Sequence, residues 1–594
     1  MKKEKKMLIP KGWILTRVVS VLLLSTVCIG QGLAQRDGRS ASEPPRFGVT
    51  NSIERLALMF VNAGVRWHRT GKFIVWESVE PSPPAKANAN TYDWSYPDSV
   101  VTAFQQAGAE LQSMLSARSS WASDGELPKA EFLDDWERFV QAAVERYDRD
   151  GIDDMPGLLR PIRYWQLGNE TYGHGIPIEA YVEFLARTHT AAQAAFAEVK
   201  IIAAEVTDVP RFLDTVDTVL IEQRARSLLD LPAGLFMLGE VAAFVHYDVF
   251  ITHFNGLSRF IPSTVWFWRT RMAEAGSERL LWGGDAASGP LLGQDPLGFR
   301  DKAVVARERA IMEILETGPS HPDYAATEAW FRRVQAREAV RKPVAIVGSG
   351  VRHMYLTAAS DWPTYEMSAW RYQGLVDLAG KQRPALYAYR LAIEKIGEAM
   401  DASPLDLGPG IFAFHWTTGD SMRYCLWADD ADITDGNEPA VTVRLPVGSR
   451  ATAVRLTTPP LAAGETEGIV ETRPVMGGEV KLTLTPTPVF VEELNITSGV
   501  DEMSSIPGEF RLYQNYPNPF NPTTTIRFTI SQREHVTLKV FDVLGREVAR
   551  LVEGELNAGE HSVVFDAKGL ASGVYFYRLT AGTFIQHKKM VVLR

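Results

Sequence analysis

Short apolar runs alternate with helix-like runs along much of the chain. The apolar runs are Arg46–Val49, Val65–Arg69, Glu110–Leu115, Ile162–Leu167, Ile201–Ala204, Val249–His253, Arg279–Trp282 and Val351–Leu356. Each is brief and apolar, as parallel strands buried on both faces are. The helical patterns include Ile53–Ala63, Phe132–Tyr147, Ile178–Val199, Thr327–Val340 and Pro384–Ile396. Eight strands that alternate with helices predict an α/β fold, a (β/α)8 TIM barrel over residues 46–400.

Two segments with a β pattern alone follow the predicted barrel. Residues 408–495 contain short strand-like runs, such as Val489–Leu494, which predict a β-sandwich. Residues 496–511 form a polar linker before residues 512–594. This last segment opens with Asn and Pro residues that cannot lie in a central strand, and strict alternation then begins at Thr525. It predicts a small antiparallel, immunoglobulin-like β-sandwich.

The N-terminus has the pattern of a secretory signal peptide. A basic stretch reaches Arg17, and the apolar stretch Val18–Ile29 is too short to span a bilayer comfortably. We expect cleavage after Ala34, so residues 1–34 are the signal peptide and residues 35–45 a linker. Cys28 suggests a lipoprotein, but Val27 does not suit that pathway. No later segment is predicted to be transmembrane.

The composition excludes some classes of partner. The chain has 45% hydrophobic and 23% charged residues, which is typical of a globular protein, and 594 residues suggest several domains. Its net charge is −10, and the last strand is the only basic stretch after the signal, so nucleic acid is not an expected partner. Removal of the signal leaves Cys425 alone, which excludes an internal disulfide. No metal-ligand cluster of cysteine or histidine residues occurs, and no cofactor is expected.

Candidate chemistry follows the fourth predicted strand. The active site of a barrel of this type lies at the C-terminal ends of its strands. The fourth strand ends in the sequence WQLGNE, so we expect Asn169 and Glu170 at the mouth of the barrel. The alternative is that this pair caps a following helix.

The last segment resembles the type A C-terminal sorting domain of the type IX secretion system. The resemblance extends from Leu512 to the C-terminus and includes LYQNYPNPFNP and the basic strand QHKKMVVLR. It implies that the secretion machinery is a partner and that the tail is removed after export. Together with the signal peptide it predicts transport to the periplasm, then across the outer membrane to the cell surface or medium. An ordinary immunoglobulin-like module is the alternative.

Residues 47–400 resemble the retaining (β/α)8-barrel glycoside hydrolases. The motif W-x-x-G-N-E is similar to their acid/base signature, and AGVRWHRTGKF, GAELQSMLSARSSW, DVFITHFNG and VRHMYLTAASDW follow the family's order. The next β-domain resembles the sandwich of family thirty-nine, the β-xylosidase and iduronidase family. The resemblance implies cleavage of O-glycosidic bonds in a carbohydrate, with Glu170 as acid/base and Asn169 as a ligand of the sugar 2-hydroxyl.

The second carboxyl group is expected from Asp285. Glycoside hydrolysis needs one group to protonate the leaving oxygen and another to attack the anomeric carbon or activate water. The family has Glu at the end of strand seven, where this chain reads LLWGGDAASGP. Because Asp is one methylene shorter, three alternatives stay open: a nucleophile on a shifted backbone, inversion through a water in a wider gap, or sugar binding without cleavage. Glu205, after strand five, is a further candidate carboxylate.

Other candidate ligands lie at the predicted strand ends. Arg69 could pair with the second carboxylate and keep it ionised, or could form a structural ion pair. Trp121 and Trp362 could stack on sugar rings, or could pack in the core or a lid. The remaining candidates are His253, Asn255, His174 and Tyr172, with a role in packing or in a solvated loop as their alternative.

The predicted function is therefore a secreted or cell-surface glycoside hydrolase. The alternative is a non-catalytic surface protein that binds carbohydrate on a degenerate barrel. A separation near 5 Å between the carboxyl groups of Glu170 and Asp285 would favour the enzyme.

Overall fold

The computed structural model of the chain describes most residues from 46 onwards. The described ranges are 46–83, 92–168, 178–203, 214–228, 246–294, 300–362, 368–494 and 510–592, with further gaps at 72, 275, 277–278, 398, 400, 420, 431, 435–437, 514, 516–517, 519, 521, 544, 558 and 583. The chain divides into two compact units, Met1–Ile496 and Thr497–Arg594. Within the described ranges, none of the helices has both the length and the apolarity needed to cross a membrane.

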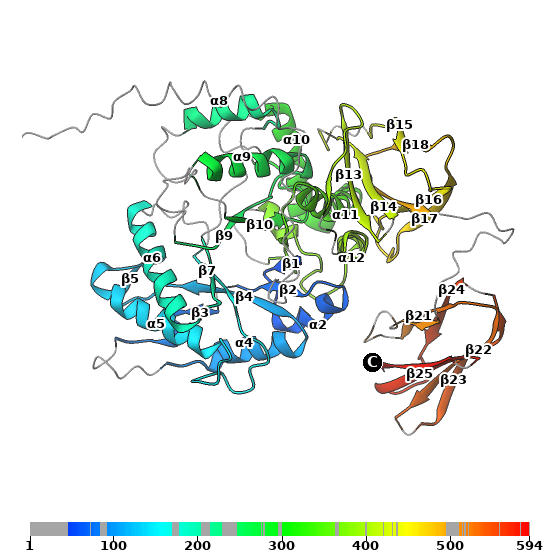
Figure 1. Ribbon diagram of the computed structural model, residues 1–594, viewed down its shortest axis with the longest axis horizontal. Helices are drawn as coiled ribbons and strands as arrows, with labels where there is room; N and C mark the ends of the chain where they lie inside the picture. The colour runs from blue at the N-terminus through cyan, green and yellow to red at the C-terminus, as the bar shows by residue number, and fades with distance from the viewer. Residues whose placement is uncertain are drawn as a thin grey trace, which may run out of the picture. The chain divides into compact units, whose positions relative to one another are not determined.

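Eight parallel strands form a closed barrel in the first unit (Figure 1). In order around the barrel they are β1 (Phe47–Thr50), β2 (Trp67–Arg69), β4 (Glu110–Ser116), β7 (Tyr164–Leu167), β8 (Lys200–Ile202), β9 (Val249–Thr252), β10 (Leu280–Ala287) and β11 (Met354–Thr357). The pairing of β11 with β1 closes the circle. The predicted TIM barrel is confirmed, and each predicted apolar run overlaps one strand; β10 extends five residues beyond its predicted run, to Ala287.

Helices connect the strands and cover the barrel from outside (Figure 1). They are α2 (Glu54–Asn62), α4 (Ser95–Gln106), α5 (Leu133–Arg146), α6 (Ile178–Ala195), α8 (Thr218–Leu228), α9 (Ile261–Glu274), α10 (Lys302–Thr317), α11 (Tyr324–Gly348) and α12 (Pro384–Ile396). Helix α5 is an example of how a helix packs against the barrel through one apolar face. Its residues Trp136, Phe139, Val140 and Ala143 are all buried, and their spacing places them on that face. Helix α11 is longer than expected because it continues through Pro343 to Gly348, a stretch that is buried throughout.

Short elements extend the barrel's rim. They are β3 (Ile74–Val75), α3 (Trp76–Val79) and the hairpin of β5 (Ser123–Asp124) and β6 (Leu127–Pro128). Strand β3 pairs with the C-terminal end of β4, beyond the point where β2 ends. The loops after the second and third strands therefore begin side by side.

The interior of the barrel is filled by large side chains from the strands alone. Trp67, Ile202, Val249, Ile251, Trp282 and Tyr355 form this cluster. Because side chains alternate between the two faces of a strand, they identify the inward positions on the strands that carry them. A residue at a strand end that lies two positions after one of these inward residues also points inward.

A β-sandwich packs beside α11 and α12 in the same unit (Figure 1). One sheet has the order β12 (Ser403–Pro404), β13 (Ile411–Thr418), β14 (Ser421–Ala428), β19 (Val489–Leu494), β16 (Ala453–Thr458) and β17 (Ile469–Pro474), and the other pairs β15 (Val441–Pro446) with β18 (Glu479–Leu484). A Cβ at Gly348 would lie 2.2 Å from the ring of Phe414, so the end of α11 needs a glycine there. Arg341 of α11 also binds Asp430 (2.8 Å) and thus ties the helix to the sandwich.

The second unit is an antiparallel sandwich with a core of its own. One sheet contains β20 (Arg511–Leu512), β21 (Thr523–Ile530) and β24 (Gly559–Asp566), and the other contains β22 (Glu534–Asp542), β23 (Glu547–Leu556), β25 (Gly573–Ala581) and β26 (Phe584–Val592). The segment of Asn and Pro residues that begins at Asn515, here called the Asn-Pro segment, is hydrogen-bonded to this sandwich. The backbone N–H of Asn515 donates to Tyr577 Oη (2.7 Å), and the Asn518 side chain accepts from the backbone N–H of Val591 (2.7 Å).

A chain that ends before Leu512 should therefore stay folded. The second unit has separate hydrophobic clusters and sheets, so its removal leaves the core of the first unit complete. We expect calorimetry of the truncated protein to show the same unfolding temperature for the remaining unit as in the full chain. A truncated protein without a cooperative transition would show that the tail is part of the first unit's core.

Candidate active site

Side chains from four adjacent strands meet at the C-terminal end of the barrel interior. On β2, Arg69 lies two residues after inward-facing Trp67, so it also points inward. Thr50 pairs with Arg69 in the parallel register and shares its face. On β11, Thr357 lies two residues after inward-facing Tyr355. All of these side chains are almost fully buried.

A β-bulge turns Asp285 into the same space. Gly283 pairs with Met354, whereas Asp285 pairs with the very next residue, Tyr355, so Gly284 is the extra residue. Trp282 faces inward, and uninterrupted alternation would have turned Asp285 outward, towards the helices. The bulge reverses this alternation. Asp285 consequently lies level with Tyr355 and faces the barrel mouth.

One oxygen of the Asp285 carboxylate is held on two sides. The hydroxyl of Thr357 donates to Oδ1 at 3.0 Å, and Nη1 of Arg69 lies 3.4 Å from the same atom. Both contacts stabilise the ionised carboxylate because the donors are a hydroxyl and a guanidinium. The Asp285 side chain is 13% exposed, and no described residue donates to Oδ2. This leaves one oxygen of the carboxylate available for a ligand.

The backbone around Asp285 is fixed by a buried lysine. The backbone N–H of Phe254 donates to the carbonyl of Asp285 (3.1 Å). Lys342 of α11, which is 1% exposed, donates to the carbonyls of Phe254 (3.0 Å) and Ala287 (2.6 Å). The Lys342 ammonium group thus bridges the segment directly after β9 and the end of β10, two residues beyond Asp285.

A hydrogen-bonded polar layer lies deeper in the barrel. Gln112 donates to the side chain of Gln166 (2.6 Å), and it accepts from Tyr355, which in turn accepts from Trp67. Gln166 donates to the carbonyl of Gly168 (2.9 Å), the residue directly before Asn169. The expected acid/base Glu170 and its neighbours Asn169, Tyr172 and His174 lie outside the described residues, as does Glu205.

His253 and Asn255 follow β9 and lie beside each other. Both are buried, and Nδ2 of Asn255 lies 3.3 Å from Nδ1 of His253. An amide nitrogen can only donate, so this His253 nitrogen accepts and the ring proton is on Nε2. The Asn255 side-chain oxygen is buried without a partner among the described groups. Asn255 lines a cavity of about 240 Å³ between the segments that follow β9 and β10, together with Arg259, Pro290, Arg300 and Glu308.

Trp121 lies in a cluster of aromatic side chains at the loops after the second and third strands. Its ring centroid is 5.0 Å from that of Trp76 and 5.5 Å from that of Phe132, both in edge-on geometry. Its N–H donates to the carbonyl of Glu80 (3.2 Å), and burial raises the pKa of the Glu80 carboxyl group. These contacts favour the packing alternative for Trp121.

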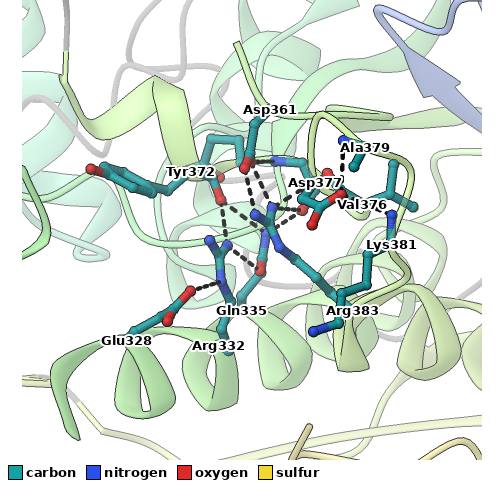
Figure 2. Close-up of polar contacts among 12 residues, drawn as sticks. Glu328, Arg332, Gln335, Asp361, Tyr372, Val376, Asp377, Ala379, Lys381 and Arg383 are labelled. Carbon is teal, nitrogen blue, oxygen red and sulfur yellow. Dashed lines mark hydrogen bonds and ion pairs between the residues drawn. The ribbon is translucent and has the colours of Figure 1, made fainter. Parts of the chain in front are cut away.

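Trp362 also packs against protein. Its ring lies 5.5 Å from that of Trp370, in a small apolar cluster with residues from α10 and α11. Its neighbour Asp361 anchors the same loop, because Arg383 binds the Asp361 carboxylate with both terminal nitrogens (Figure 2). The backbone N–H of Gly374 adds a third hydrogen bond to it (3.0 Å).

Side chains of helix α11 hydrogen-bond to this loop, which follows the eighth barrel strand, β11. Figure 2 shows Arg332 and Gln335 side by side on the helix; Arg332 donates to the carbonyl of Tyr372 (2.8 Å). Gln335 donates to the hydroxyl of Ser288 (2.9 Å), directly after β10. Burial, with the nearby charge of Arg383, lowers the pKa of Arg332 to about 10. The network joins the loops after the seventh and eighth strands, the two strands that carry Asp285 and Thr357.

Among the described residues, a cluster of three acidic side chains could hold a cation, but it lies at the other end of the barrel. Glu145, Asp148 and Asp150 offer ligand atoms within 4.8 Å of one another. Glu145 lies in the last turn of α5, and Asp148 and Asp150 come directly after it and before β7, so all three belong to the N-terminal face of the barrel. The carboxylates of Asp148 and Asp150 already accept backbone N–H groups. We assign no ion to them.

Comparison with family models explains the second unit. Residues 514–593 match the family described as secretion system C-terminal sorting domain. The tail is a sorting domain of this family. The match covers the Asn-Pro segment and all strands from β21 onwards. Domains of this family are sorting domains of a secretion system. Comparison with curated proteins finds no match.

Solved structures similar to this chain include glycoside hydrolases. A family 39 glycoside hydrolase from Bacteroides cellulosilyticus WH2 has a TM-score of 0.51 and 12% identity, over 76% of this chain and 81% of that one. A β-xylosidase from Caulobacter crescentus CB15 has a TM-score of 0.46 and 14% identity, over 77% and 98%. A bacterial orthologue of human α-L-iduronidase has a TM-score of 0.45 and 12% identity, over 92% and 96%. At this identity, the first of them shows that the fold is shared.

Three residues of the site were not predicted from the sequence. Thr50 and Thr357 are the last residues of strands β1 and β11, and Lys342 is a charged residue in a helical pattern. The position of the threonines was a usable signal, since each directly follows a predicted apolar run at the face where the site was expected. Lys342 had no such signal, because charged helix residues usually face solvent.

Lys342→Met should destabilise the first unit. The substitution leaves the carbonyls of Phe254 and Ala287 buried without this donor, and an unsatisfied buried polar group costs about 1–3 kcal/mol. We expect the free energy of unfolding, measured by urea denaturation, to fall by about 2–4 kcal/mol. Lys381→Met, at an exposed position, is the control and should change it by less than about 0.5 kcal/mol. Equal effects of the two substitutions would contradict the role of Lys342.

Proposed function

We propose that the protein is an exported glycoside hydrolase that cleaves O-glycosidic bonds of oligo- or polysaccharides with retention of configuration. Glu170 acts as acid/base and Asp285 as nucleophile. The observation that carries the proposal is the Asp285 carboxylate at the C-terminal end of the barrel, with Oδ1 held by Arg69 and Thr357 and Oδ2 facing no described donor. The shared barrel fold and the WQLGNE motif support it.

The proposed mechanism has two steps. Oδ2 of Asp285 attacks the anomeric carbon while Glu170 gives its proton to the leaving oxygen, so a glycosyl-aspartate forms and the leaving group departs as an alcohol. Glu170, now a carboxylate, then takes a proton from water, whose oxygen attacks the anomeric carbon and releases Asp285. Arg69 stays beside Asp285 throughout and stabilises its charge in the free enzyme and after release.

The bulge at Gly284 supports the assignment of a shorter nucleophile. A retaining enzyme needs its two carboxyl groups about 5–5.5 Å apart, and Asp has one methylene less than the Glu of the similar enzymes. The extra residue changes the path of β10 immediately before Asp285. A local change of backbone path is what a shorter side chain needs to present its oxygen at the same distance.

Binding space for the sugar is proposed along the strand ends. Two polar side chains at the cavity, Arg300 and Glu308, can bind sugar hydroxyls, and the cavity is bordered by Asn255. His253 lies next to it and holds the amide in place. A screen of aryl glycosides tests the proposed activity and identifies the sugar; binding of oligosaccharides without hydrolysis of any of them would favour the non-catalytic alternative.

The location of the protein is proposed from its two ends. The sorting-domain match supports export through the type IX system, and the predicted signal peptide supports passage through the periplasm first. The substrate is then a carbohydrate outside the cell.

Glu170→Gln should separate substrates by their leaving groups. The amide cannot donate the proton that a poor leaving group needs, whereas an activated aryloxide departs without it. We expect kcat/KM to fall by about 100-fold or more for unactivated glycosides and much less for dinitrophenyl glycosides. Steady-state kinetics on both classes measures this, and equal losses on both would remove Glu170 from the acid role.

Asp285→Asn should abolish turnover of every substrate, because no covalent intermediate can form. The matched control is Asp377→Asn, since the Asp377 carboxylate accepts backbone N–H groups in a turn of the strand-eight loop.

Asp285→Glu restores the arm length of the similar enzymes, and on this bulged backbone we expect it to be less active than the unmodified protein. NMR of the first-formed sugar should show retention; full activity of Asp285→Ala would direct the search for the second carboxylate to Glu205.

A further inference from the structure

Two buried threonines form a hydrogen-bonded chain that ends on the Asp285 carboxylate. The Thr50 and Thr357 hydroxyl oxygens are 2.8 Å apart, and Thr357 Oγ1 is 3.0 Å from Asp285 Oδ1. Both threonines are 0% exposed. The residues belong to three neighbouring strands, β1, β11 and β10, although 307 positions separate Thr50 from Thr357.

The direction of the chain follows from the number of protons. An ionised carboxylate can only accept, so Thr357 must donate its single hydroxyl proton to Asp285. The Thr357 oxygen therefore accepts from Thr50, whose proton has to point at Thr357. Each hydroxyl is thereby locked in one orientation, and hydrogen bonds in such a chain strengthen one another.

The side chains are also rigid in themselves. Threonine is β-branched, so its χ1 angle has few allowed values, and both threonines lie at the ends of paired strands. Arg69, which pairs with Thr50 in the sheet, lies 3.4 Å from the same Oδ1 atom and comes from a different strand, β2. Oδ1 is thus fixed between two donors, and rotation of the carboxylate about its Cβ–Cγ bond would break both contacts.

We propose that Thr357 is a positioning residue that sets the plane of the Asp285 carboxylate, and that Thr50 acts only by orienting the Thr357 hydroxyl. The proposal rests on the proposed function, because it assigns these residues to the presentation of Oδ2 to the anomeric carbon. A carboxylate on a short arm has few ways to correct its direction, so its plane must be set by neighbours. Misplacement of a reacting group by about 1 Å can cost 100-fold in rate.

Valine is the informative replacement, because it keeps the shape of threonine and removes the hydroxyl. Thr357→Val should lower kcat on activated aryl glycosides by about 10- to 100-fold and leave KM within about twofold, since sugar binding does not use this hydroxyl. Thr357→Ser, which keeps the hydroxyl, should stay within about threefold of the unmodified protein. Thr252→Val, a buried threonine at the end of β9 without a contact to Asp285, is the matched control and should change kcat by less than about twofold.

A double-mutant cycle tests the order of the chain. Thr50→Val should lower kcat by a smaller factor than Thr357→Val, and the double variant should be no slower than Thr357→Val alone, because the Thr50 hydroxyl acts through the Thr357 hydroxyl. Multiplying effects of the two substitutions would overturn the chain. So would unchanged kcat in Thr357→Val, or a loss in Thr357→Ser as large as that in Thr357→Val.

The outcomes distinguish this proposal from the proposed function. An active protein whose Asp285→Asn variant is inactive, with Thr357→Val unaffected, overturns the positioning role alone. A protein that binds oligosaccharides without hydrolysis contradicts the proposed function, and it also overturns the positioning role, which needs a reaction. A protein that neither binds nor cleaves sugars overturns both.

Discussion

The closure of eight parallel strands into a barrel is the constraint on which the candidate site depends. The pairing of β11 with β1 brings the last strand of the barrel beside the first, so side chains from positions 50 and 69 meet those from positions 285 and 357. No local element could make this arrangement. These four side chains therefore meet only when the barrel is closed.

A second level of support lies around β10. The bulge at Gly284 directs Asp285 inward, and Lys342 joins the carbonyls on either side of it. Lys342 lies on α11, the helix that also holds the strand-eight loop through Arg332 and binds the β-sandwich through Arg341. The sandwich thereby contributes to the site at a distance, because it packs against the helix that fixes the backbone of Asp285. This gives a physical reason for the two parts to form one compact unit.

The sequence predicted the barrel because buried parallel strands have a pattern that local residues carry. Each of the eight apolar runs overlaps a strand, and the Arg69 guanidinium lies 3.4 Å from the Asp285 carboxylate. The bulge was not predicted, since a shift of one residue on β10 is defined only by its pairing with β11. The Thr50–Thr357 contact was not predicted either, because two hydroxyls far apart in the chain meet only after closure. The roles assigned to Glu170 and Asn169 stay predictions from the motif.

The central claim is that Asp285 forms a covalent bond to the sugar. The most direct test is mass spectrometry of the protein after reaction with an activated 2-deoxy-2-fluoro glycoside of the sugar it hydrolyses, which slows release of the intermediate. We predict that digestion yields one labelled peptide and that fragmentation places the sugar on Asp285. A label on Glu205 or another carboxylate, or rapid hydrolysis of the parent glycoside with no label on any peptide, would contradict the claim.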